Sequence, residues 1–150
     1  MDPLTKLLWA MQNEDANPKL VIIDPKNGAQ KTYTFGPTPH GGGYDGIAFQ
    51  GDDVFLSASN PANSPNNRPA IVRARLGAGT VSVSPVLEGD AMAIDIPTDT
   101  RVTLNLQDPD SMACDPPRDL VLDSQADARE PGQGVYPFVT NLGWILGADR

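Results

Sequence analysis

The chain has 150 residues, of which 39% are hydrophobic and 20% are charged, so it is long enough for one folded domain and is unlike a disordered chain. Its formal net charge is −8, and its 11 basic residues form no cluster, which argues against nucleic acid and anionic membrane surfaces as partners. With 15 prolines and 14 glycines, the chain is interrupted too often for long helices, so the composition favours an all-β fold.

The sequence shows no targeting or membrane-spanning segment. No apolar run approaches the length of about 18 residues that a membrane span needs. The first residues, MDPLTKLLWAM, lack the basic start of a signal peptide. We expect a soluble chain, cytoplasmic as written, and periplasmic or secreted if an N-terminal signal has been lost. The single cysteine, Cys114, excludes an internal disulfide and leaves the redox compartment open.

A hairpin is predicted near the N-terminus. KLVIID (19–24) and KTYTF (31–35) are typical of strands, and the DPKNG turn between them combines a fixed φ with a glycine that tolerates positive φ. Before this hairpin, the apolar spacing of LTKLLWAM fits a short amphipathic helix, although LLWAM fits a strand equally well.

The middle of the chain predicts a four-stranded antiparallel unit. Its strands are DGIAF (45–49), DVFLSA (53–58), AIVRARL (70–76) and TVSVSPVL (80–87), each joined to the next by a turn or loop. We expect them to pair in consecutive order. The unit has about the length of one β-propeller blade, ~40–45 residues.

Part of this unit recurs later in the chain. DGIAFQGDDVFL, from Asp45, aligns with DSMACDPPRDLVL, from Asp110, with one extra residue in the second turn. The identical positions are Asp45 and Asp110, Ala48 and Ala113, Asp53 and Asp119, and Leu56 and Leu122. Between the two copies, AMAIDI (91–96) and RVTLNL (101–106) form either an inserted hairpin or strands of a degenerate blade.

The predicted fold is therefore all-β, with antiparallel four-stranded blade repeats. Residues 1–150 form a single β-propeller-like region: 19–35 end one blade, 45–87 are a complete blade, 91–125 are a further hairpin and the start of another blade, and 129–150 are an irregular tail. These add up to about three blades, whereas propellers close with about 4–8. We expect a partial β-propeller, an interior fragment of a longer chain that self-associates, with an open sheet or sandwich as the alternative.

The stretch His40-Gly41-Gly42-Gly43 matches the HGGG oxyanion loop of some lipases and esterases. That loop serves a serine on a G-x-S-x-G turn, and this sequence contains no such turn. Because the chain has one histidine, a histidine-based triad would need His40, and no serine stands out as its nucleophile. The plain interpretation of HGGG is a glycine-rich connection into a strand. If the stretch is part of an active site instead, His40 is the candidate catalytic residue.

Aspartates crowd the stretch from Asp108 to Asp119 and suggest a calcium loop. An EF-hand that starts at Asp108 needs an oxygen ligand at position five and glycine at position six, where Met112 and Ala113 stand. The sequence therefore rejects an EF-hand. A different calcium site stays open beside the plain alternative of surface aspartates in turns.

At YDGIAFQGDDVFLSA and DPDSMACDPPRDLVLDS the sequence resembles the propellers of the gluconolactonase and senescence-marker-protein superfamily. The resemblance covers Lys19 to Ser124 and implies a β-propeller. In the enzymes of that superfamily, the Asp of a Pro-Asp-Gly step can bind a divalent metal at the channel mouth, which implies a metal-binding role for Asp45 and, through the internal alignment, for Asp110. Tyr44 and Ser111 depart from the Pro-Asp-Gly pattern, and the other ligand motifs of the family are missing.

The sequence thus predicts a non-catalytic β-propeller repeat region that serves as a scaffold or as a binding surface for a small molecule or a protein. The alternative is a calcium-dependent lactonase-like hydrolase. In that alternative, Asp45 and Asp110 bind Ca²⁺, the one cofactor that the sequence suggests, and His40 is a nearby general base or substrate contact.

Overall fold

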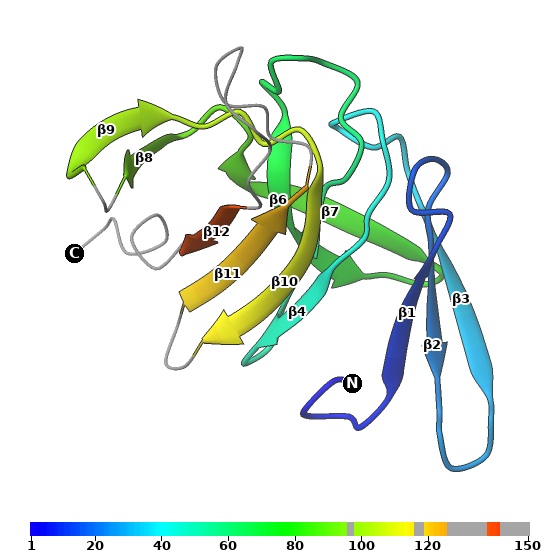
Figure 1. Cartoon of the computed structure of the whole chain (residues 1–150). Coiled ribbons are helices and arrows are strands. Elements are labelled where there is room, and N and C mark those ends of the chain that lie inside the picture. Colours follow the sequence, from blue (N-terminus) through cyan, green and yellow to red (C-terminus); the bar gives the residue numbers. More distant parts are fainter. Residues whose placement is uncertain (96–97, 116–118, 126–137, 142–150) are drawn as a thin grey trace.

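The computed structural model describes residues 1–95, 98–115, 119–125 and 138–141. These residues form strands and loops without a helix, and the strands curve into a nearly closed, barrel-like arrangement (Figure 1). The described part therefore has no helix of the length and apolarity that a membrane crossing requires. The predicted all-β class is confirmed.

The largest sheet has seven strands in the order β1-β2-β3-β7-β6-β5-β4. Its strands are β1 (Leu8–Gln12), β2 (Lys19–Ile23), β3 (Gln30–Phe35), β4 (Ile47–Gln50), β5 (Asp53–Ser57), β6 (Pro69–Leu76) and β7 (Thr80–Glu88). All neighbours are antiparallel except β3 and β7, which pair in parallel over two residues each. This short parallel contact joins a three-stranded part, β1–β3, to a four-stranded part, β4–β7.

The predicted four-stranded unit is confirmed as a pairing pattern. β4, β5, β6 and β7 pair with their sequence neighbours in antiparallel fashion. The predicted N-terminal hairpin is also present, as β2 and β3. LWAMQ is a strand, β1, so the helical alternative for this stretch is wrong. Alternation decides it: Trp9 and Met11 pack on the core, whereas Leu8 and Ala10 lie on the opposite side of the strand.

Two smaller sheets complete the described fold. β8 (Met92–Asp95) and β9 (Thr100–Thr103) form a two-stranded sheet of their own, which is the inserted-hairpin alternative. The third sheet has the order β10-β11-β12, with β10 (Pro109–Asp115), β11 (Asp119–Ser124) and β12 (Phe138–Asn141). Residues 129–150 were predicted to be an irregular tail. Within them, Phe138–Asn141 form β12, because their backbone pairs with the edge of β11. The rest of that tail lies outside the described residues.

The β4–β5 and β10–β11 hairpins pair in the same register. Ile47 lies opposite Leu56, and the aligned residues Met112 and Leu122 lie opposite each other. The next three cross-strand pairs also correspond, down to Gln50 with Asp53 in one hairpin and Asp115 with Asp119 in the other. The aligned sequences thus make equivalent hairpins.

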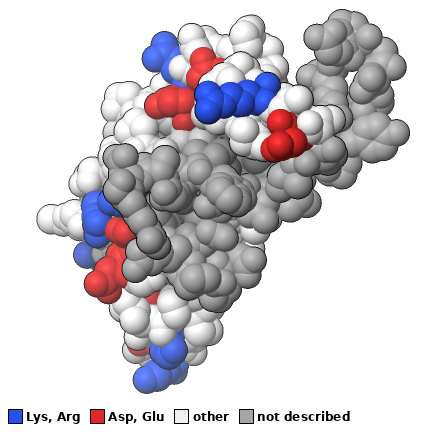
Figure 2. Space-filling model, turned by 90° about the vertical axis from the view of Figure 1, so that its left-hand side faces the viewer, with Lys and Arg blue, Asp and Glu red and all other residues white. Residues whose placement is uncertain are grey.

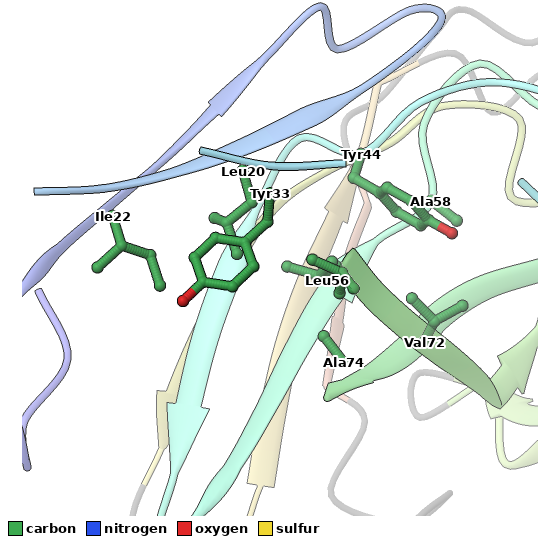
Figure 3. Close-up of a cluster of buried hydrophobic side chains, with 9 residues drawn as sticks. Leu20, Ile22, Tyr33, Tyr44, Leu56, Ala58, Val72 and Ala74 are labelled. Carbon is green, nitrogen blue, oxygen red and sulfur yellow. The ribbon is translucent and has the colours of Figure 1, made fainter. Parts of the chain in front are cut away.

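Two hydrophobic clusters pack on the two faces of β4–β7. The first lies between β1–β3 and one face of β4–β7 and includes Leu20, Tyr33 and Leu56 (Figure 3). The second lies between the other face of β4–β7 and the β10–β11 hairpin and includes Phe55 and Leu122. The β4–β7 part of the large sheet therefore lies between β1–β3 and the β10–β11 hairpin.

The same face of each hairpin contacts the sheet before it. In β4–β5, Ile47, Val54 and Leu56 pack toward β1–β3. In β10–β11, the aligned residues Met112, Leu120 and Leu122 pack toward β4–β7. On the opposite face of β4–β5, Ala48 and Phe55 pack toward the following sheet. We call the face that packs toward earlier strands of the chain the preceding face, and the face that packs toward later strands the following face.

Candidate functional site

The HGGG stretch is a loop through which the chain passes very close to other backbone. A Cβ atom at Gly43 would overlap the carbonyl oxygen of Glu14, and one at Gly42 would overlap the carbonyl oxygens of Ser59 and Asn60. Gly41 has a φ of +89°, which side chains disfavour. The glycines are therefore required by the packing of this loop between the β1–β2 turn and the loop after β5.

The backbone amides of this loop already have partners. The Gly41 N–H donates to the Thr38 carbonyl at 3.2 Å, and the Gly43 N–H donates to the Ser59 carbonyl at 3.2 Å. An oxyanion hole needs amide donors that are directed at a substrate. Here the two amides stabilise the loop itself, which agrees with the plain interpretation of HGGG as a connection.

His40 is part of the same packing. Its side chain is 1% exposed, its Nε2 donates to the Gly43 carbonyl at 2.5 Å, and its ring contacts the Tyr44 ring edge-on at a centroid distance of 5.1 Å. Nδ1 is buried and makes no well-formed hydrogen bond. Burial lowers the pKa of His40, while the backbone of Gly43 and Ser59 acts in the opposite direction. The imidazole is therefore neutral at pH 7.

The structure brings Asp45 and Asp110 together. Their side chains are hydrogen-bonded to each other, although 65 positions separate them in the chain. The backbone fixes this arrangement, because the Gly46 N–H donates to the Asp110 carbonyl at 3.1 Å. The buried Ser57 hydroxyl accepts from the Gly46 N–H at 2.6 Å and itself donates to the Asp110 carbonyl. The starts of β4 and β10 thus lie side by side.

Asp45 is surrounded by groups that raise its pKa. Partial burial, the hydrogen bond to Asp110 and the negative charges of Asp110, Glu14 and Asp108 together raise the pKa of Asp45 to about 6. The pKa of Asp108 is also raised, mainly by burial and further by the charges of Asp110 and Asp15, against the stabilising N–H of Asn60. Carboxylates from three loops therefore face one another at one end of the sheets.

We call this group, Glu14, Asp15, Asp45, Asp108 and Asp110, the acidic end. Glu14 and Asp15 belong to residues 13–17, the turn between β1 and β2, which line an open hollow. Sequence reasoning selected Asp45 and Asp110 through the internal repeat and met Asp108 only as an EF-hand position. It missed Glu14 and Asp15, because nothing in the turn's own sequence shows that β1–β3 packs beside β4.

The metal-binding capacity of the acidic end is limited in the described part of the chain. No set of three or more His, Cys, Asp or Glu side chains in it is placed to hold one metal ion. Ca²⁺ takes about 6–8 oxygen ligands, so Asp45 and Asp110 would need carbonyl oxygens and water in addition. His40 bonds within its own loop instead, where its Nε2 donates to the Gly43 carbonyl.

Elsewhere on the described surface, basic and acidic side chains are mixed. Figure 2 shows Lys and Arg scattered beside Asp and Glu on one face. On β5 and β6, Arg75 makes an ion pair with Asp53 at 2.8 Å, and Arg73 lies 3.6 Å from the same carboxylate. The like charges gather instead at the acidic end.

Comparisons of the chain with protein-family models, with curated proteins and with solved structures each found no match. The function must therefore be inferred from the geometry of the chain itself.

Proposed function

We propose that this chain is a non-catalytic β-propeller repeat region that acts as a scaffold and presents a binding surface. The observation that carries the proposal is the packing of two hairpins: they have equivalent sequence and register, and each directs the same face toward strands that precede it in the chain. Stacked antiparallel sheets in chain order are the arrangement of propeller blades. The resemblance to the gluconolactonase and senescence-marker-protein superfamily supports the same architecture.

The contacts of His40 and of the HGGG loop support a structural role for both. The histidine is buried, neutral and bonded to the backbone of its own loop, and two loop amides donate to carbonyls of the chain. A general base needs access to the substrate proton that it abstracts. His40 has the environment of a packing residue.

The acidic end is the binding surface that we propose. Its carboxylates come from the β1–β2 turn and from the starts of β4 and β10, and partial burial together with the nearby negative charges raises the pKa of Asp45. A positively charged group would relieve the repulsion among these charges. The ligand class that fits is therefore a cation or a cationic side chain of a partner.

A specific observation favours a second candidate, a calcium-dependent lactonase-like hydrolase. Asp45 and Asp110, the two positions that the resemblance implies as metal ligands, lie within hydrogen-bonding distance of each other. In this candidate the two carboxylates hold Ca²⁺ together with oxygens that the described residues do not supply.

Calorimetric titration of Ca²⁺ into the full chain, combined with a lactone hydrolysis assay, separates the two candidates. Asp45→Asn is compared with Asp52→Asn, which removes the same charge from the exposed β4–β5 turn. The scaffold proposal expects no turnover in any variant, and cation binding that weakens in Asp45→Asn and not in Asp52→Asn. Calcium-dependent turnover in the wild type that Asp45→Asn abolishes and Asp52→Asn retains would establish the hydrolase and overturn the scaffold proposal.

A further inference from the structure

The preceding face of the first sheet is apolar and has no sheet packed against it among the described residues. Its central residues are Leu8 and Ala10 of β1 and Val21 and Ile23 of β2, which lie opposite each other as Leu8 with Ile23 and Ala10 with Val21. Leu8 is 37% exposed and Ala10 and Ile23 are half-buried, whereas Val21, between Ala10 and Thr32, is 5% exposed. Neither of the two hydrophobic clusters of the described chain contains any of the four. In Figure 1 this sheet lies at the far side of the molecule from the β8–β9 hairpin.

The sequence of these strands is typical of strands that are covered on both faces. A strand with one solvated face alternates apolar and polar residues, whereas LVII in β2 and LWAM in β1 are apolar at every position. In β3, by contrast, the residues on the same face are Gln30, Thr32 and Thr34. The apolar part of the preceding face is thus limited to β1 and β2.

In the β4–β5 and β10–β11 hairpins, the preceding face is covered by other strands. Val54 and Leu56 of β5 are covered by β1–β3, and Leu120 and Leu122 of β11 are covered by β4–β7. The apolar preceding face of β1–β2 corresponds to these covered faces, but the described chain has no earlier strands to cover it. The surface that would cover it in the same way is the following face of a sheet such as β10–β11.

That following face is also present on the chain. Ala113 of β10 is exposed and Val121 of β11 is half-buried, and they align with Ala48 and Phe55, the residues of β4–β5 that contact the next sheet. Asp123 lies on the same face as Val121, and Lys19 lies on the preceding face of β2, so the two faces have opposite charges at these positions.

The side chain of Asp123 also indicates that a partner can pack on the following face of β11. It aligns with Ser57, whose hydroxyl donates to the backbone at the start of the following sheet. The Oδ1 atom of Asp123 is buried and has no hydrogen-bond partner. A buried carboxylate oxygen without a donor is unfavourable, and the start of a further sheet would bring backbone N–H groups to this position.

We infer that two copies of this chain bind head to tail, the preceding face of β1–β2 in one copy packing on the following face of β10–β11 in the other. The inference rests on the proposed stacked scaffold and extends it. In the dimer that we infer, a two-fold axis relates the two contacts, and each copy provides both faces once. Six sheets then complete the circle, within the range of about 4–8 that propellers use.

Sedimentation velocity of the full chain over a range of concentrations tests this inference. The wild type is expected to reach an apparent mass twice its 16.0 kDa. Leu8→Glu blocks the preceding face and Ala113→Arg blocks the following face, so each variant alone should stay monomeric. Their equimolar mixture should recover a mixed dimer, because each retains the face that the other lacks. Leu76→Glu, which places the same charge at an exposed apolar residue at the end of β6, should dimerise like the wild type.

A wild type that stays monomeric at every concentration overturns the inference, and so does a mixture of the two variants that stays monomeric. Dimers of Ala113→Arg alone also overturn it, because they would show that two preceding faces pack on each other. Circular dichroism checks each variant for folding, and Ile23→Lys replaces Leu8→Glu if the latter unfolds. Cation binding and turnover are separate measurements, so a failure of this inference can be told from a failure of the proposed function.

Discussion

The ring of Trp9 in β1 meets the ring of Phe49 in β4 edge-on, with a centroid distance of 5.3 Å and an interplanar angle of 88°. β1 and β4 are the two end strands of the seven-stranded sheet, so this contact closes the gap between its edges. A double-mutant cycle with Trp9→Leu and Phe49→Leu should give a coupling free energy of about 0.5–1.5 kcal/mol in urea unfolding. Additive effects of the two substitutions would show that the rings do not stabilise each other.

The Nε1 atom of Trp9 provides a control for this cycle, because it is buried without a hydrogen-bond partner. Trp9→Phe removes that unpaired donor and keeps an aromatic ring against Phe49. We expect it to change the free energy of unfolding by less than about 1 kcal/mol, well below the cost of Trp9→Leu.

Gly43→Ala should strongly destabilise the protein. Its Cβ would overlap the Glu14 carbonyl oxygen, which is itself held by the Ser59 hydroxyl at 3.0 Å, so neither backbone segment can move without loss. We expect a loss of about 3 kcal/mol in the free energy of unfolding, or failure to fold. Gly36→Ala is the matched control, because a Cβ there meets no atom within 4 Å, and it should stay within about 1 kcal/mol of the wild type. Equal effects of the two substitutions would contradict this account of the loop.

The raised pKa of Asp45 predicts a loss of stability as the pH rises. Its pKa is about 6 in the folded chain and near its usual value of about 4 when unfolded, so the folded state binds the proton more tightly. The stabilisation is complete below about pH 4 and disappears as the pH rises through 6. Urea unfolding from pH 4 to 7 should therefore show a downward slope in the wild type relative to Asp45→Asn. Parallel profiles would mean that folding does not raise the pKa of Asp45.

His40 predicts the opposite slope in a neighbouring pH range. Burial lowers its pKa, so the unfolded chain binds the proton more tightly below the usual value of about 6.5. This contribution to stability is present above that pH and is lost as the pH falls through it. His40→Gln, which retains a donor for the Gly43 carbonyl, should flatten this part of the profile. A wild-type profile that His40→Gln leaves unchanged would place His40 in solvent.

Much of the fold could be predicted because its strands carry their own signals. Alternation and turn residues located β2 to β7, and the alignment of DGIAFQGDDVFL with DSMACDPPRDLVL anticipated two hairpins of the same register. β1 was ambiguous because apolar residues in LTKLLWAM satisfy both the helical and the strand period, and pairing with β2 decides between them. β12 was missed because its four residues are defined by the free edge of β11 rather than by a pattern of their own.

Of the candidate site, only the residues that lie within the internal repeat could be predicted from the sequence. The alignment singled out Asp45 and Asp110, which prove to be hydrogen-bonded to each other. Glu14 and Asp108 join them through the packing of separate loops, a long-range effect that local sequence does not encode. For His40 the sequence left two roles open, and burial with a backbone partner favours the structural one.

The short parallel contact between β3 and β7 has a consequence for how the molecule opens. Among the described residues, the backbone pairing between β1–β3 and the rest of its sheet is confined to Thr34 and Phe35 with Thr80 and Val81. The first three strands and β4–β7 are each held by their own extensive ladders. Amide hydrogens of β1–β3 are therefore expected to exchange as one cooperative group, at a free energy below that of global unfolding. The two-residue bridge is the hinge of that partial opening.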